Sequence, residues 1–279
     1  MYEIWNANGL QSVASEQLDS LFAEGGNGMM APLGFTPGER WEYGIGIDWA
    51  GNIVATLSGK GLDAYFQDHI FAPLGMHDSR YAVPEEKAAI RAAIHVRTED
   101  GLTVAPHPVK AVSGGGGLSS TINDYLRFMR ALMNQGTLDG AIILQPYTVD
   151  MMFENHIGDL DVTPGSTYLP AFSNDFDMGF GQPAKWGLGF LLHEAQTESG
   201  RPKGSVSWAG LFNSYFWIDR ENDLCAVIST HVLPFFDTYE IAMLKDFETA
   251  VYKNIKFKID ISLFHVGKLN NVASGKSYD

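Results

Sequence analysis

Apolar residues recur at helical spacing in the first half of the chain. One set follows steps of three and four residues, which predicts a helix that buries these side chains on one face. The set is Ile47, Ala50, Ile53, Val54 and Leu57. Asp48 falls in the first turn of this helix, where a carboxylate suits the helix dipole. The same spacing predicts three more helices, over residues 61–71, 123–134 and 145–154.

The pattern changes to strand-like alternation from Trp186 onward. It predicts antiparallel strands over residues 187–193, 206–210, 213–219 and 224–232, with a hairpin turn at 220–223. A closing amphipathic helix is predicted over residues 236–253. Helices followed by strands and a last helix are typical of an α+β fold rather than of alternating βαβ units.

This pattern predicts three parts. They are a mainly helical domain over residues 1–185, an antiparallel sheet with its closing helix over 186–256, and a partly disordered tail over 257–279. Within the first part, residues 79–108 are polar and turn-rich and predict a surface excursion. Residues 155–185 form a long loop, and long loops inside a domain tend to be functional rims.

Tyr43 is the first residue that suggests chemistry. Pro37-Gly38 predicts a turn, so Tyr43 lies on the approach to the first predicted helix. A phenol held there can carry a proton, but its ordinary pKa near ~10 means that it needs a neighbouring cation to act as a base at neutral pH. The alternative is that Trp41, Tyr43 and Trp49 form an aromatic core cluster.

Composition narrows the class of partner. The 279 residues are 45% hydrophobic, carry a formal charge of -14 and include a single cysteine. The negative charge and the lack of a basic run argue against nucleic acid and anionic membranes. Cys225 lies in an apolar run, which indicates a small buried hydrophobe rather than a nucleophile. The first residues lack signal-peptide features, which favours the cytoplasm unless a leader precedes Met1.

Motifs for cofactors and metals are missing from the sequence. The four glycines of residues 114–117 lack the Lys-Ser/Thr of a P-loop, so they indicate close backbone packing. The eight histidines show no metal-ligand spacing, and the acidic residues of 155–185 do not match a calcium loop. We expect no cofactor and no metal. A G-x-S-x-G elbow is also absent, which excludes an α/β-hydrolase mechanism.

Four segments together resemble the serine β-lactamase-related superfamily, and within it most resemble family VIII carboxylesterases. Class C β-lactamases and D-alanyl-D-alanine peptidases are relatives. The segments are GERWEYGIGIDWAG at 38–51, IFAPLGMHDS at 70–79, GGLSSTINDYLRF at 116–128, and Trp208-Ala209-Gly210. The similarity extends from about Tyr2 to about Ile255.

The resemblance implies a β-lactamase-like α+β fold, in which a helical domain lies beside an antiparallel sheet and the reaction takes place at their junction. In that family the serine of an S-x-x-K motif attacks a carbonyl, while the lysine and a tyrosine manage its proton. Tyr43 matches the tyrosine motif. Trp208, Ala209 and Gly210 match the third motif, which borders the substrate. Backbone N–H groups there would hold an oxyanion, at roughly 3 kcal/mol per donor.

One departure from the family pattern limits what the resemblance implies. No serine in the 279 residues has a lysine three positions later. The N-terminal strands and the nucleophile helix of the family are therefore expected to be missing from this chain. Ser119, Ser120 and Ser207 are substitute nucleophiles, and Arg40 and Lys185 are substitute cations.

The resemblance predicts a serine ester hydrolase that acts on a small ester or amide through an acyl-enzyme, with Tyr43 as the base; weak β-lactamase activity is left open. The nucleophile is then a substitute serine or comes from a second chain. One alternative is an impaired remnant that only binds ligand. The other is a fragment that self-associates, because missing strands would leave an exposed sheet edge and favour a homodimer.

Overall fold

A computed structural model describes residues 33–107 and 112–266. Its centre is a five-stranded antiparallel sheet with the order β5-β6-β7-β8-β9. The strands are β5 (Ala184–Trp186), β6 (Leu191–His193), β7 (Val206–Gly210), β8 (Ser214–Asp219) and β9 (Leu224–Ser229). β8 and β9 are joined by the predicted hairpin turn, with Asp219 paired to Leu224.

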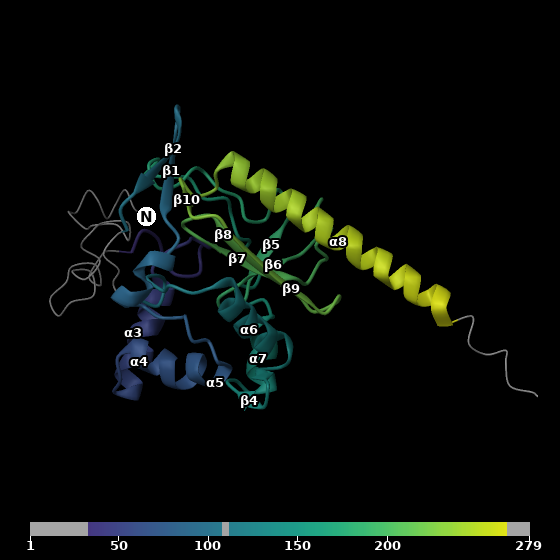
Figure 1. The fold of residues 1–279 in the computed structure, drawn as a ribbon, viewed down its shortest axis with the longest axis horizontal. Coiled ribbons are helices and arrows are strands. Elements are labelled where there is room, and N and C mark those ends of the chain that lie inside the picture. Colours follow the sequence, from purple (N-terminus) through teal and green to yellow (C-terminus); the bar gives the residue numbers. More distant parts are fainter. Residues whose placement is uncertain (1–32, 108–111, 267–279) are drawn as a thin grey trace, which may run out of the picture.

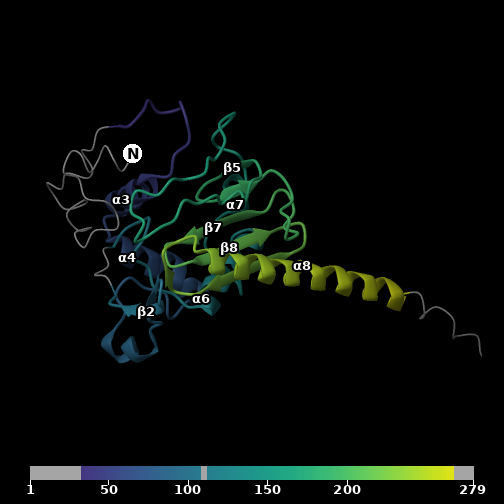
Figure 2. The same cartoon turned by 90° about the horizontal axis from the view of Figure 1, so that it is seen from above.

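Helices cover both faces of this sheet (Figure 1). Alternate residues of β8 point in opposite directions, so Trp217 packs with Leu244 of α8 (Thr238–Val266) while Ile218 packs with Met129 of α6 (Ile122–Met133). α8 lies along one face, and its C-terminal end extends beyond the rest of the fold (Figure 2).

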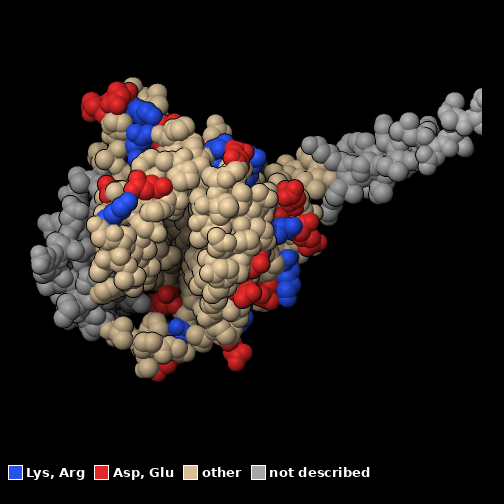
Figure 3. Space-filling view, turned by 90° about the horizontal axis from the view of Figure 1, so that it is seen from below, with Lys and Arg blue, Asp and Glu red and all other residues tan. Residues whose placement is uncertain are grey.

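The remaining helices form a group beside the sheet. They are α3 (Gly46–Ser58), α4 (Leu62–Phe66), the π-helix Gln67–Phe71, α5 (Ala72–Leu74), the 3-10 helix Glu85–Ile90 and α7 (Pro146–Met152). The short hairpin of β3 (Thr137–Leu138) and β4 (Ala141–Ile142) follows α6. α5, α6 and β3 share a second core through Leu74, Ala131 and Leu138. The side of the molecule on which α3, α4 and α7 lie carries few charges and is hollowed by a groove (Figure 3).

Residues 79–107, the described part of the predicted surface excursion, are largely exposed as expected, but they also contain two strands that were not predicted. β1 (Ile94–Thr98) pairs with β2 (Gly101–Ala105) and, in parallel, with β10 (Val232–Leu233). The pairing of His95 with Val232 joins segments that are far apart in sequence, and local periodicity does not report such a contact.

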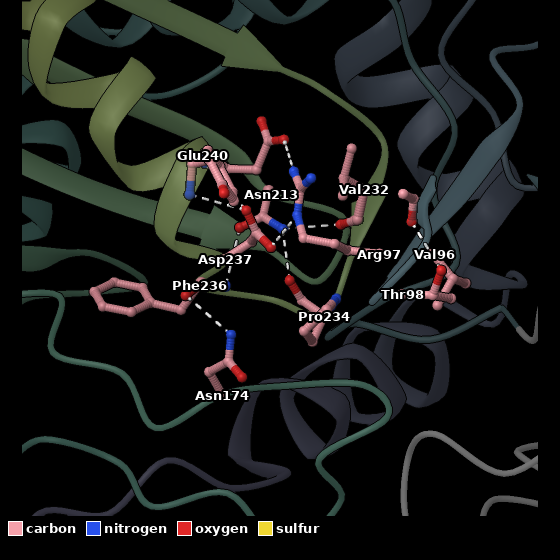
Figure 4. A network of polar contacts seen from close by, with 12 residues as sticks. Val96, Arg97, Thr98, Asn174, Asn213, Val232, Pro234, Phe236, Asp237 and Glu240 are labelled. Atoms are coloured by element: carbon pink, nitrogen blue, oxygen red, sulfur yellow. Dashed lines mark hydrogen bonds and ion pairs between the residues drawn. The ribbon is translucent and has the colours of Figure 1, made fainter. Parts of the chain in front are cut away.

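Polar contacts anchor β1 to the start of α8 (Figure 4). Arg97 donates from Nε to Asp237 at 2.5 Å and from Nη2 to Glu240 at 3.2 Å. Asn213, in the β7–β8 turn, donates to the carbonyls of Val232 and Pro234 at 2.8 Å each. The turn beside Gly210, the strand β10 and the start of α8 therefore hold one another in place.

The predicted domain boundaries remain a prediction, with two differences from the observed elements. β1 and β2 lie inside the part expected to be mainly helical, and α8 continues to Val266, inside the range expected to be a tail. The short helix expected near the N-terminus lies outside the described residues.

α3 forms where it was predicted, but its orientation differs from the prediction. The side chains of Ile47, Ile53 and Leu57 are 43%, 55% and 83% exposed, whereas Asp48 and Gly51 are buried. The prediction of a buried apolar face was therefore wrong.

Candidate active site

The fold brings Tyr43 and Trp208 together, although 165 positions separate them in the sequence. Their ring centroids are 5.4 Å apart, with an interplanar angle of 43°. Tyr43 comes from the segment before α3 and Trp208 from β7, so the contact joins the helical group to the sheet. Tyr43 is 40% exposed and Trp49 is 42% exposed, so the alternative of an aromatic core cluster was wrong for both residues.

Two more tryptophans extend this contact. Trp208 meets Trp186, at the end of β5, with centroids 4.7 Å apart and an interplanar angle of 89°. Trp186 in turn meets Trp41 at 5.4 Å and 46°. The sequence analysis did not identify Trp186 as a site residue, because Trp186 stood out there only as the first residue of the strand region. Its pairing with Trp41 depends on tertiary structure.

The environment of Tyr43 disfavours the phenolate. Desolvation by the surrounding protein raises the pKa of Tyr43, a hydrogen bond with the Trp208 side chain lowers it, and the Asp48 carboxylate raises it further. The net shift is upward from an ordinary value of 10.0, so the phenol is protonated at neutral pH. Tyr43 is therefore a proton donor in this environment, and it needs added positive charge to become a base.

Asp48 is a second residue of the site that the sequence did not single out. Its buried carboxylate accepts hydrogen bonds from the Ser113 hydroxyl and, at 2.9 Å, from the Gly115 backbone N–H. Burial raises the pKa of Asp48, and the bond from Gly115 offsets part of that rise. From the sequence, Asp48 was expected only to interact favourably with the dipole of the helix that begins beside it. We call Asp48, Ser113 and Gly115 the Asp48 clamp.

The glycines of residues 114–117 allow this clamp to form. A Cβ on Gly114 would lie 2.2 Å from the Ile47 carbonyl oxygen, and one on Gly115 would lie 2.7 Å from an Asp48 carboxylate oxygen. Gly114 also approaches Gly51 of α3, because a Cβ on Gly51 would be 3.0 Å from Gly114 Cα. The prediction that these glycines serve close backbone packing is confirmed for Gly114, whereas Gly115 makes room for the Asp48 side chain and a Cβ on Gly116 would meet nothing within 4 Å.

The two substitute cations are engaged with other groups. Arg40 pairs with Glu42 at 3.0 Å and lies over the Phe35 ring. Lys185 donates to the Leu160 carbonyl at 2.6 Å and pairs with Asp161 at 2.9 Å.

Trp208, Ala209 and Gly210 extend past the neighbouring strand on one side. β8 pairs with all five residues of β7, whereas β6 pairs only with Val206 and Ser207. The backbone from Trp208 onward therefore has no β6 ladder partner on that side. This open edge contains the third motif, and its first residue, Trp208, contacts Tyr43.

The substitute serines occupy different environments. Ser207 is only 1% exposed, and its hydroxyl lies 2.8 Å from His193 Nε2, so an ester cannot reach it. Ser119 exchanges backbone hydrogen bonds with Arg80. Ser120 is exposed, and its hydroxyl lies 2.7 Å from that of Ser79. Ser207 is thus excluded as the nucleophile.

The described residues, 33–107 and 112–266, contain neither a cluster of metal-ligand side chains nor a candidate membrane-spanning helix. They hold no group of three or more His, Cys, Asp or Glu side chains arranged to bind a metal. No helix in these ranges is both long and apolar enough to cross a membrane.

Comparison with known proteins places the chain in a family. The Beta-lactamase family model matches residues 28–244, which is most of the chain. The chain belongs to the beta-lactamase family. Its β-lactamase-like α+β fold agrees with the fold implied by the sequence motifs.

The relatives of this family member include esterases and acyltransferases. Lovastatin esterase of Penicillium rubens is 29% identical over 210 residues, covering 70% of this chain and 51% of the relative. Esterase EstB of Burkholderia gladioli is 26% identical over 227 residues, covering 72% and 52%. The unliganded selenomethionyl structure of simvastatin synthase (LovD) from Aspergillus terreus superposes with a TM-score of 0.69 at 25% identity, covering 90% and 61%. The chain spans about half the length of the curated relatives it matches.

Proposed function

We propose that this chain takes part in the hydrolysis or transfer of carboxylic ester acyl groups through an acyl-enzyme. The observation that carries the proposal is the contact of Tyr43 with Trp208 at the open edge of β7, in a chain whose relatives include esterases and acyltransferases. A small ester or amide is the substrate class.

In the proposed first step a hydroxyl oxygen bonds to the ester carbonyl carbon and its proton passes to the Tyr43 phenolate. Alternate N–H groups of a strand face opposite edges, so only those N–H groups of Trp208, Ala209 and Gly210 that point away from β8 would stabilise the oxyanion, each by about 3 kcal/mol. The alcohol then leaves with the proton that Tyr43 returns. Water or a second alcohol attacks the acyl-enzyme in the same way and releases the acid or a new ester.

Tyr43 needs positive charge beside it in this scheme. The pKa of Tyr43 is raised in the described environment, and both Arg40 and Lys185 are paired with carboxylates. A cation that approaches the exposed part of the ring would favour the phenolate. The nucleophile is Ser119, Ser120 or a hydroxyl from a second chain, because Ser207 is buried.

A second candidate function follows from the same observations. A protonated Tyr43 with no adjacent free cation among the described residues favours an impaired remnant that binds ligand without turning it over.

The experiment that separates the two functions is covalent labelling followed by intact-mass spectrometry. The chain is incubated with a fluorophosphonate and, separately, with a short p-nitrophenyl ester. The Tyr43→Phe variant removes only the phenolic hydroxyl, and Tyr147→Phe, at an exposed tyrosine of α7, is the matched control.

A single stoichiometric adduct that is lost in Tyr43→Phe and kept in Tyr147→Phe supports the acyl-enzyme, and peptide mapping then names the nucleophile. An adduct that survives in Tyr43→Phe refutes Tyr43 as the base. No adduct in a folded chain refutes the hydrolase and leaves the binding remnant.

The edge strand β9 supports a further proposal, that the chain forms a homodimer. Within the described residues β9 pairs only with β8, and its six residues include Cys225, Val227 and Ile228. An apolar edge strand is a template for pairing with another chain. Light scattering at increasing protein concentration should therefore report a dimer mass, and a constant monomer mass would exclude the pairing.

A further inference from the structure

Four aromatic rings form a continuous series that begins at Tyr43. Tyr43 contacts Trp208, Trp208 contacts Trp186, and Trp186 contacts Trp41, with centroid separations of 5.4, 4.7 and 5.4 Å. Tyr43 is exposed and the three tryptophans are half-buried. We call these four residues the aromatic wall.

The partial exposure of these rings needs a physical reason. Tryptophan and tyrosine usually gain stability by burying large apolar areas, and contiguous apolar surface that stays exposed is typical of binding sites. Leu188 and Leu211, close in sequence to Trp186 and Gly210, are each 42% exposed. The wall also includes Tyr43, so it is continuous with the proposed reaction centre.

The charges around the wall disfavour an anionic ligand. Arg40 and Lys185, the cations next to Trp41 and Trp186 in the sequence, are paired with Glu42 and Asp161. The charge of Asp48 is felt at Tyr43, since it raises the pKa of that phenol. An anionic ligand would therefore meet a negative field without a free counter-charge.

We propose that the aromatic wall binds a planar, uncharged ring system carried by the ester, and so selects aryl and fused-ring esters over small aliphatic ones. A flat ring stacks or packs edge-to-face against the tryptophans, while the ester bond lies toward the Tyr43 end of the series. The ligand's identity as an ester rests on the proposed function, whereas its ring rests on the wall itself and the exclusion of an anion rests on the charges around the wall.

The test is isothermal titration calorimetry with acetylnaphthalene, a neutral fused-ring ketone that has a carbonyl but no leaving group. Cyclohexyl methyl ketone is the aliphatic comparison, naphthoate the anionic one and phenyltrimethylammonium the cationic one. Trp186→Leu removes the ring in the middle of the wall. Trp49→Leu is the matched control, because Trp49 is also partly exposed but makes none of the ring contacts of the wall.

We expect acetylnaphthalene to bind about tenfold more tightly than the aliphatic ketone, and Trp186→Leu to weaken its binding by about tenfold while Trp49→Leu leaves it unchanged. Equal binding of the two ketones, or equal losses in the two variants, would overturn the proposal. Tighter binding of phenyltrimethylammonium would also overturn it, in favour of a cation site. If Trp186→Leu does not fold, Trp41→Leu at the end of the wall takes its place.

The binding measurement is independent of the labelling experiment. Ketone binding by a folded chain that forms no fluorophosphonate adduct would refute the proposed function and keep the aromatic wall as a ligand site. An adduct without ketone binding would support the proposed function and refute the aromatic wall as a ligand site.

Discussion

The close approach of Gly114 to α3 leads to a sharp prediction about stability. In Gly114→Ala the new Cβ would lie 2.2 Å from the Ile47 carbonyl oxygen and 3.2 Å from Gly51 Cα. Ordinary C···O contacts are about 3.3 Å or longer, so the loop and the helix must separate by about 1 Å. The neighbours are backbone atoms, which cannot rotate away as a flexible side chain can.

The expected cost is that of overpacking, about 1–3 kcal/mol. In a domain of this size each kcal/mol lowers the melting temperature by about 2–4 °C, so about 2 kcal/mol corresponds to about 4–8 °C. Gly116→Ala is the matched control, because a Cβ on Gly116 meets nothing within 4 Å and neither glycine has a positive φ. We expect Gly116→Ala to change the melting temperature little.

The assay is thermal unfolding followed by circular dichroism, with Tyr43-dependent labelling measured on the same samples. Gly114→Ala should lose labelling along with stability, because the shift occurs where Asp48 holds the start of α3. Equal melting temperatures for the two variants would show that the close approach of the loop to α3 is not a real constraint, and the reasoning would fail.

Two further predictions concern the buried polar groups behind β7. Glu248→Gln removes the carboxylate that pairs with the buried Arg201 at 2.7 Å and should cost about 3–5 kcal/mol in urea unfolding. Glu194→Gln, at the exposed pair with Lys203, should cost under about 1 kcal/mol, and equal losses would contradict the argument. Burial lowers the pKa of His193 to about 3 from an ordinary 6.5, and Arg201 adds to the shift. The unfolded chain therefore binds a proton at His193 more readily than the folded chain does. The free energy of unfolding is unaffected by this difference above pH 6.5 and falls as the pH drops toward 3, by up to about 1.4 kcal/mol per pH unit. Urea midpoints at a series of pH values should show a shallower acid loss in His193→Gln, and an identical pH dependence would refute this role.

The sheet was largely predictable from the sequence because its central strands are short apolar runs bounded by turn residues. The predicted strands over 206–210 and 213–219 correspond to β7 and β8, and the turn at 220–223 joins β8 to β9. The runs carry this information because each face of the sheet packs on a different helix, so both faces of β8 need apolar residues at its centre.

The orientation of α3 was not predictable, for a physical reason. Spacing shows which residues share a helical face but does not show which face another element covers. Here the side with Asp48 and Gly51 is covered, because a loop about 65 positions away supplies a hydroxyl and a backbone N–H for the carboxylate. The composition of α3 alone contains no sign of that partner. β1 was missed for the same reason, because its pairing with β10 is a contact between segments far apart in the sequence.

The Asp48 clamp connects the fold to the chemistry of Tyr43. Asp48 fixes the start of α3, and its carboxylate also makes the phenolate of Tyr43 less favourable. The group that fixes the start of α3 thus also favours the protonated form of Tyr43. Positive charge for a basic Tyr43 has to reach the exposed part of its ring, the same side on which a ligand would meet the aromatic wall. A ligand on the aromatic wall that carries no positive charge would not lower the pKa of Tyr43. The proposed binding and the proposed acylation are therefore separate properties, and the calorimetric and labelling experiments can give different answers for one protein.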